Sequence, residues 1–260
     1  MNPEKEKNLY KILEASYFGE GMQEQEEMEA LMAMLNGVKT FVDAGASLGQ
    51  YAHQANGQLR DAHIICIEAD SVRVKRLKEL TEEWSSASTN RIEAIHAAVS
   101  NENGETTFYE TNDDLCGGLD HYWSADEFTG YGNIVPQAVK VRCLTLDSLF
   151  PDTPPDLVKI DVEGAEYRAV MGSVNMLRGK KTRFAVEMHP WGDKSLDKKT
   201  SDVFQIFLNH GYDFKRLHKL WHFYPSEKFK WLLWPKYKFA QIVMDSNQLR
   251  KWAKKILRRG

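Results

Sequence analysis

The sequence predicts one α/β domain in which a mainly parallel sheet is covered by helices on both faces. Two observations lead to this fold class. Apolar runs of strand character alternate with helix-like stretches that are long enough to connect parallel strands, and turn residues separate the runs. At 260 residues the chain can bury one sizeable core, and we find no internal repeat or low-complexity linker that would divide it.

The expected elements follow one another from residue 28 to residue 246. We expect strands at residues 40–45, 63–69, 92–100, 106–111, 139–146, 156–162, 183–189 and 238–246. We expect helices at residues 28–36, 71–84, 165–178 and 201–210. Gly37 predicts the end of the first helix, and "NENGE" at residues 101–105 is typical of a turn that makes a hairpin of its two flanking runs.

Composition excludes some classes of function. The 34 Lys and Arg residues nearly balance the 37 Asp and Glu residues, so no global positive field argues for nucleic acid as a partner. Cys66, Cys116 and Cys143 lack the spacing of metal ligands and predict free thiols in a reducing compartment. Because we find neither a signal-peptide core nor an apolar run approaching about 18 residues, we expect a cytoplasmic protein.

The segment "TFVDAGASLGQY", residues 40–51, predicts a strand that breaks at Gly45 into a tight turn and a helix. A P-loop would need Gly-Lys-Ser/Thr here, and a dinucleotide fingerprint would need G-x-G-x-x-G, but Ser47 stands at the second glycine position. The turn also matches the G-x-S-x-G of a hydrolase, with an Asp and a His downstream. That fold needs an oxyanion-hole loop upstream, however, and residues 1–39 look helical.

A third interpretation of the turn accounts for more of the sequence. Gly45 and Gly49 permit a ligand to approach the backbone at the carboxyl end of the first strand. Asp43 precedes the turn and suits an ammonium group, while Glu68 ends the second strand, where an acid commonly binds a ribose diol. An amino acid joined to a ribose without phosphate describes S-adenosylmethionine.

Six segments carry a resemblance to a known family. They are "FVDAGASLGQY", "CIEAD", "AAVSNENGETTFY", "LTLDSL", "VKIDVEGAEYRAVMG" and "FAVEMH". In this order they resemble the FkbM family of S-adenosylmethionine-dependent methyltransferases over roughly residues 38–190, and "KIDVEGAE" is the most specific of their motifs. Ser47 stands where the family often has Asn, a change that should leave backbone contacts intact.

The resemblance implies a Rossmann-like class I methyltransferase fold. This fold has a mainly parallel seven-stranded sheet with helices on both faces, here with an extra hairpin and N-terminal helices. Ala98 and Ser100 are our choices for contacts to adenine. The full set of expected cofactor-binding residues is Asp43, Gly45, Ala46, Ser47, Gly49, Glu68, Ala69, Ala98, Ser100 and Asp161.

Catalytic candidates lie at two further strand ends. Strand alternation places Lys159, Asp161 and Glu163 on one face, and Glu187 and His189 on one face of the other strand. If these strands are neighbours, the acids and the imidazole meet beside the reactive methyl. We predict Asp161, His189 and Glu187 as catalytic, with His189 or Asp161 as the direct base.

Two alternatives for these residues stay open. Some of the acids could instead pair with Lys159 or, like Glu163 and Glu166, complement the dipole of the following helix. Asp161, Glu187 and His189 could also hold a magnesium-class ion that lowers the pKa of a substrate hydroxyl. We favour a direct base over a divalent metal.

The two ends of the chain suggest appendages. We expect an N-terminal helical segment at residues 1–37, in which Tyr17–Gly21 could form a lid, and a methyltransferase domain at residues 38–246. Residues 217–239 interleave aromatics with lysines, as an insertion packed before the last strand, a sugar-stacking wall, a membrane patch or a nucleic-acid platform would. Residues 247–260 predict a basic amphipathic helix that docks on the domain or contacts the inner face of a membrane.

These observations predict an O-methyltransferase that acts on a hydroxyl of a sugar, a glycan or a natural-product precursor, with no nucleic-acid partner. One rival is an N- or carboxyl-directed methyltransferase with the same cofactor site. The other is a non-catalytic, membrane-associated scaffold that kept the fold.

Overall fold

The computed structural model describes residues 25–110, 117–119, 136–189, 193, 196–217, 220–228, 230 and 232–242. The expected lid at Tyr17–Gly21, the basic helix at residues 247–260 and Cys116 lie outside these residues. Cys66 and Cys143 are free and buried. Within the described part of the chain, no helix combines the length and the apolar character needed to cross a bilayer.

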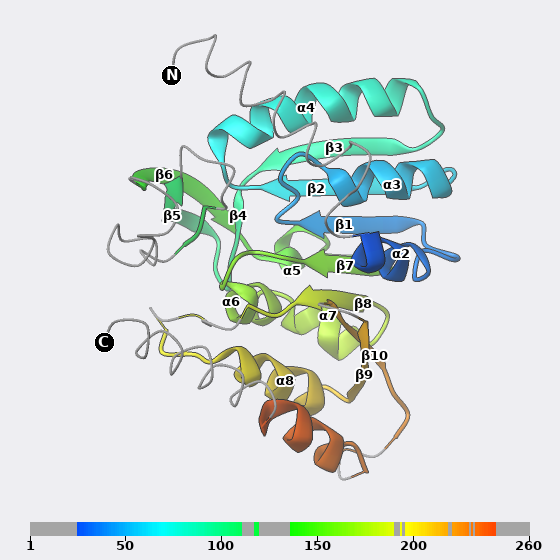
Figure 1. Ribbon diagram of the computed structural model, residues 1–260, viewed down its shortest axis with the longest axis vertical. Coiled ribbons are helices and arrows are strands. Elements are labelled where there is room, and N and C mark those ends of the chain that lie inside the picture. Colours follow the sequence, from blue (N-terminus) through cyan, green and yellow to red (C-terminus); the bar gives the residue numbers. More distant parts are fainter. Residues whose placement is uncertain are drawn as a thin grey trace.

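A seven-stranded sheet forms the centre of the molecule (Figure 1). Its strands are β1 (Thr40–Ala44), β2 (His63–Glu68), β3 (Arg91–His96), β7 (Leu157–Ile160), β8 (Arg183–Glu187), β9 (Tyr212–Leu217) and β10 (Leu220–Pro225). They lie in the order β3-β2-β1-β7-β8-β10-β9, and β10 runs antiparallel to both of its neighbours. The sheet is therefore mainly parallel, as expected, with one reversed strand.

Helices cover both faces of the sheet. They are α2 (Gln25–Met32), α3 (Gln50–Gln58), α4 (Ser71–Ser86), α5 (Leu146–Leu149), α6 (Glu166–Met171), α7 (Val174–Gly179) and α8 (Thr200–Asn209). Apolar side chains of α2, α3 and α4 pack in one core cluster, and those of α6, α7 and α8 pack in another. The start of α4 is fixed by Asp70, whose carboxylate accepts hydrogen bonds from the amides of Val72 and Arg73.

A small second sheet lies beside the carboxyl ends of the parallel strands (Figure 1). It contains β4 (Ala98–Val99), β5 (Gly104–Glu110) and β6 (Gln137–Leu144) in the order β4-β6-β5. The hairpin expected across residues 101–105 was wrong, because β6 lies between the two runs. The amide of Ser100 donates to the carbonyl of Leu144 over 2.8 Å, so the first run pairs with β6. The extra antiparallel pair is instead β5 with β6.

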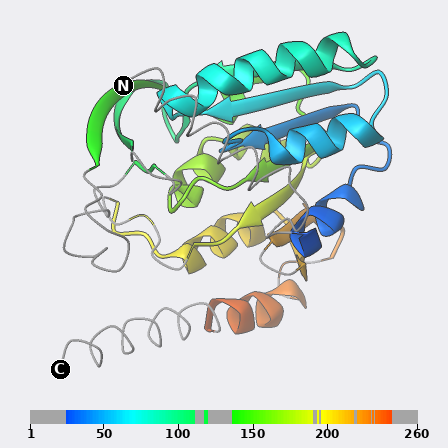
Figure 2. The ribbon, with the colours of Figure 1, turned by 45° about the horizontal axis from the view of Figure 1, so that its top comes forward.

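The strand expected at residues 238–246 was also wrong. Residues 232–242 are helical, and β10 is the last strand within the described residues. The buried side chains of Leu233, Tyr237 and Ala240 recur at helical spacing, which gives this segment one apolar face against the core. Figure 2 shows this helix, drawn orange to red, at the end of the molecule away from β3.

Candidate functional site

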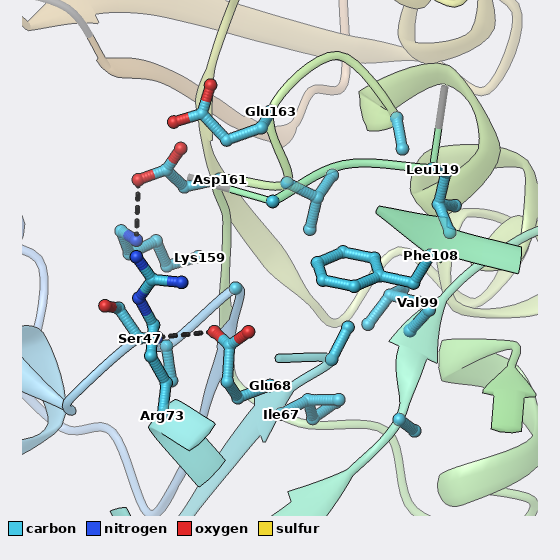
Figure 3. A pocket seen from close by; sticks show the side chains of 18 of the residues that line it. Ser47, Ile67, Glu68, Arg73, Val99, Phe108, Leu119, Lys159, Asp161 and Glu163 are labelled. Atoms are coloured by element: carbon cyan, nitrogen blue, oxygen red, sulfur yellow. Dashed lines mark hydrogen bonds and ion pairs between the residues drawn. The ribbon is translucent and has the colours of Figure 1, made fainter. Parts of the chain in front are cut away.

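A cavity opens at the carboxyl ends of β1, β2 and β7, the edge where open α/β sheets bind ligands. Figure 3 shows a polar side with Ser47, Glu68 and Asp161, and an apolar side with Phe108 and Val99. Among the residues that the structure describes, the lining is Gly45, Ala46, Ser47, Gln50, Tyr51, Ile67, Glu68, Ala69, Arg73, Ala97, Ala98, Val99, Phe108, Gly117, Leu119, Lys159, Asp161, Val162, Glu163, Ala165 and Glu187.

The glycine turn forms one wall of the cavity. At Gly45 its backbone packs closely against the loop that follows β7. A Cβ at Gly45 would lie 1.8 Å from the carbonyl oxygen of Asp161, so only glycine fits there. The amides of Gly45 and Ala46 both donate to the carbonyl of Ile67, over 2.9 and 3.0 Å. Gly49 has a φ of 80° at the start of α3 and packs on Leu77 and Trp84 rather than on the cavity.

Glu68 links the two loops at the polar side of the cavity. Its carboxylate accepts hydrogen bonds from the amide of Ser47 over 2.7 Å and from the amide of Asp70 over 2.8 Å. Burial raises the pKa of Glu68 above its ordinary value. Each carboxylate oxygen has a second lone pair, so Glu68 can still accept hydrogen bonds from a ligand in the cavity.

Asp43 and Lys159 form a buried ion pair, of which Lys159 lines the cavity and Asp43 does not. The carboxylate of Asp43 is fully buried and lies 3.4 Å from the Lys159 ammonium, which lies 3.2 Å from the carboxylate of Asp161. Burial raises the pKa of Asp43. Burial alone would lower the pKa of Lys159, but the charges of Asp161 and Asp43 outweigh it and hold the pKa well above the usual value.

This pair changes the role expected for Asp43, which does not belong to the cavity lining. β1 and β7 are neighbours in a register that sets Asp43 opposite Lys159, so the nearest cation to Asp43 is part of the protein. The sequence does contain both residues. What it could not provide is the register that brings them together.

The apolar side of the cavity comes largely from residues that sequence reasoning missed. Phe108 lies on β5 and is buried, and Val99 and Leu119 lie near it in Figure 3. Phe108 was not predicted as a site residue, because the sequence does not show that β5 pairs with β6 beside the cavity. Of the two residues chosen for adenine, Ala98 lines the cavity and Ser100 does not.

The ends of β7 and β8 bring three carboxylates to one histidine. His189 Nδ1 lies 2.8 Å from Glu166 Oε1, and this oxygen also accepts a hydrogen bond from the amide of Gly164 over 3.0 Å. On the other side of the ring, His189 Nε2 lies 3.3 Å from Glu163 Oε2 and 3.8 Å from Asp161 Oδ1. The predicted meeting of Asp161, Glu163 and His189 is therefore present.

The acids control the charge of this histidine. Burial alone would lower the pKa of His189, but Glu166, Glu163 and Asp161 outweigh burial and raise the pKa to about 10. At neutral pH the imidazole carries both protons, so it has no lone pair with which to accept another. Its positive charge instead holds the carboxylates of Asp161 and Glu163 together.

The same residues can be considered as metal ligands. One ligand atom from each of Asp161, Glu163 and His189 lies within 4.8 Å of the others. Glu187, which sequence reasoning placed in this set, lines the cavity but is not part of the group, and Glu163 takes its place. Two carboxylates and an imidazole are compatible with several divalent ions, so the donor set alone does not select one.

Comparison with protein families gives one match. The model of the Methyltransferase FkbM domain matches residues 43–214, which include both the glycine turn and the acids around His189. Among curated proteins, no sequence matches this chain significantly.

Three of the solved structures that this chain resembles are methyltransferases. The methyltransferase FkbM from Methylobacillus flagellatus is 17% identical with a TM-score of 0.48, over 72% of this chain and 44% of that protein. This chain thus matches less than half of that protein's length. A TehB-like SAM-dependent methyltransferase from Corynebacterium glutamicum is 13% identical with a TM-score of 0.44, over 86% of this chain and 100% of that one. Magnesium protoporphyrin IX methyltransferase from Synechocystis is 11% identical with a TM-score of 0.41, over 76% and 77%.

Proposed function

Because the chain belongs to the FkbM family of methyltransferases, we propose that it transfers the methyl group of S-adenosylmethionine to a hydroxyl oxygen. The acceptor we propose is a sugar, a glycan or a natural-product precursor. The observation that carries the proposal is the single cavity wall that combines the glycine turn, the Glu68 carboxylate and the Asp161 carboxylate.

The residues of the cavity fit this cofactor. Glu68 offers carboxylate lone pairs for the two hydroxyls of a ribose, and Phe108, Val99 and Leu119 offer an apolar surface for a flat base. We assign the amino-acid end to the glycine turn, rather than to Asp43 as first expected. When bound, S-adenosylmethionine supplies a methyl group attached to a positively charged sulfur.

The acids at the ends of β7 and β8 suit a hydroxyl acceptor. A hydroxyl proton becomes strongly acidic as its oxygen bonds to carbon, so a carboxylate suffices to accept it. We propose Asp161 as this base, because it lines the cavity and is held in place by the Lys159 ammonium. Protonated His189 lies on the other side of the Asp161 carboxylate and also holds it by charge. Glu187 and Glu163 offer carboxylate oxygens as acceptors for further hydroxyls of the substrate.

The proposal is tested by mass spectrometry of methyl transfer from labelled S-adenosylmethionine to a library of hydroxylated acceptors. Asp161→Asn should lower kcat by about 10²- to 10⁴-fold, the usual range for loss of a general base, while cofactor binding weakens far less. Asp152→Asn, at an exposed position, is the matched control and should retain full activity. A product methylated on nitrogen or on a carboxylate, or an Asp161→Asn variant as active as the control, would exclude this mechanism. Activity that survives exhaustive chelation would exclude an essential metal.

A further inference from the structure

The helix at residues 232–242 has large apolar side chains on the side that faces away from the core. Leu232 is 50% exposed, Trp234 49%, Phe239 71% and Ile242 61%. Only two other large apolar side chains of the described chain are exposed to a comparable degree, Met171 and Leu196, and neither belongs to this helix. A surface helix of a globular protein normally turns polar residues outward, so this arrangement indicates a surface that is covered by something else.

The opposite face of this helix anchors it to the domain. Leu233, Tyr237 and Ala240 are buried in the core. The Tyr237 hydroxyl donates to the carbonyl of Tyr212 over 2.7 Å, and the Lys236 ammonium pairs with the buried carboxylate of Asp213. The inner face of the helix thus makes the contacts that hold it to the domain. The exposed side chains have no remaining core to enter.

Positive charge is concentrated in the part of the sequence that contains this helix. Residues 228–260 contain ten of the 34 Lys and Arg residues of the chain but only one of its 37 acids, Asp245, so the remainder of the protein is strongly acidic. Lys238 lies on the helix itself, with its ammonium 5.7 Å from the centre of the Trp234 ring. Six of these ten basic residues belong to residues 243–260, which lie outside the described part of the chain.

We propose that the helix at residues 232–242 docks on the surface of an anionic lipid bilayer. Exposed aromatic and aliphatic side chains beside lysines are the composition of interfacial helices, in which the apolar groups enter the headgroup region and the ammonium groups meet lipid phosphates. A second copy of this chain fits the surface less well, since face-to-face packing of two such helices would bring like charges together, Lys238 against Lys238 among them. A nucleic acid fits the surface less well too, because it offers no apolar partner for the exposed aliphatic side chains of Leu232 and Ile242.

This inference is independent of the proposed function, and its test needs neither cofactor nor acceptor. The full chain is sedimented with vesicles of phosphatidylcholine that contain about a third phosphatidylglycerol, and with vesicles of phosphatidylcholine alone. We expect binding to the anionic vesicles, weakened at about 0.5 M salt because exposed charges are then screened. Binding to the double variant Trp234→Ser, Phe239→Ser should fall about tenfold or more.

The matched control is the double variant Met171→Ser, Leu196→Ser, which removes exposed apolar side chains elsewhere and should bind like the unmodified protein. Circular dichroism of both variants verifies that they are folded. Equal vesicle binding by the two double variants would overturn the proposal. So would the absence of binding to anionic vesicles, or a stable dimer in analytical ultracentrifugation that the Trp234→Ser, Phe239→Ser variant converts to monomer.

Discussion

At Gly45 the chain passes so close to the loop after β7 that a single methyl group does not fit. Gly45→Ala would place its Cβ 1.8 Å from the Asp161 carbonyl oxygen, at a φ of 79° that alanine adopts only with strain. We expect this variant to lose about 3 kcal/mol or more of unfolding free energy, as severe overpacking does. Urea denaturation measures this loss.

Gly57 is the control for this prediction, because it lies in α3 with nothing within 4 Å of the position its Cβ would take. Gly57→Ala should be neutral or stabilising by up to about 1 kcal/mol, since alanine is the better helix former. Equal stabilities of the two variants would show that the close approach of the β1 and β7 loops is not as described.

His189 gives the site a stability that depends on pH. Its pKa is about 10 in the folded protein, against an ordinary value of 6.5. Because the folded value is the higher one, this stabilisation is fully present below about pH 6.5 and is lost as pH rises through about 10. We expect the unfolding free energy to fall over this window for the unmodified protein and much less for His189→Gln, as measured by urea denaturation at a series of pH values. Parallel pH curves for the two proteins would contradict the ion network.

The sequence could predict a site residue where a side chain that suits a ligand also stands at the end of a predicted strand. Glu68 and Asp161 close buried strands, and the carboxyl ends of such strands meet at one edge of the sheet, so both line the cavity. The expected role of Asp43 was different because the register of β1 against β7 decides which cation it meets. Glu166 is a similar case. Its contact with His189 joins two elements 23 residues apart, and no local pattern reports such a contact.

Among the elements, β9 and the helix at residues 232–242 depend on one carboxylate. Asp213 is buried and pairs with the ammonium groups of Lys236 and Lys228. Burial alone would raise the pKa of Asp213, but hydrogen bonds from Lys236 and Lys228 outweigh it and lower the pKa. We expect Asp213→Asn to cost about 2 kcal/mol of unfolding free energy, the usual scale for hydrogen bonds to a charged group.

Glu227→Gln is the matched control for this variant, because Glu227 is exposed. It should change the unfolding free energy by less than about 0.5 kcal/mol. Hydrogen exchange should show faster opening of residues 232–242 in Asp213→Asn. Unchanged exchange in this helix would refute its anchoring through Asp213.

The elements that periodicity could not predict share a physical reason. The parallel strands β1, β2, β7 and β8 are short, apolar and separated by helices, so their existence and direction follow from the sequence. Short apolar runs near the end of the chain fit a strand or a buried helix equally well. There, tertiary packing determines which structure forms: β10 pairs with β8, and residues 232–242 are helical.

Across the whole molecule, the proposed chemistry and the proposed membrane contact use different regions. The cavity lies at the carboxyl ends of the central strands, and the helix at residues 232–242 lies at the end of the molecule away from β3 (Figure 2). The positive charge is concentrated in residues 228–260, which leaves the domain that holds the cavity acidic. A protein arranged in this way can hold its catalytic domain beside an anionic surface while its own acids keep the domain off that surface.

The proposed activity requires that the cavity be a site for S-adenosylmethionine. Isothermal titration calorimetry of the purified chain tests this directly. The prediction is a saturable heat with a Kd of about 1 μM to 1 mM. Glu68→Ala should lower the affinity at least tenfold, and Glu79→Ala, which changes an exposed acid on α4, should leave it unchanged. No heat at millimolar cofactor, or equal binding by these two variants, would contradict it.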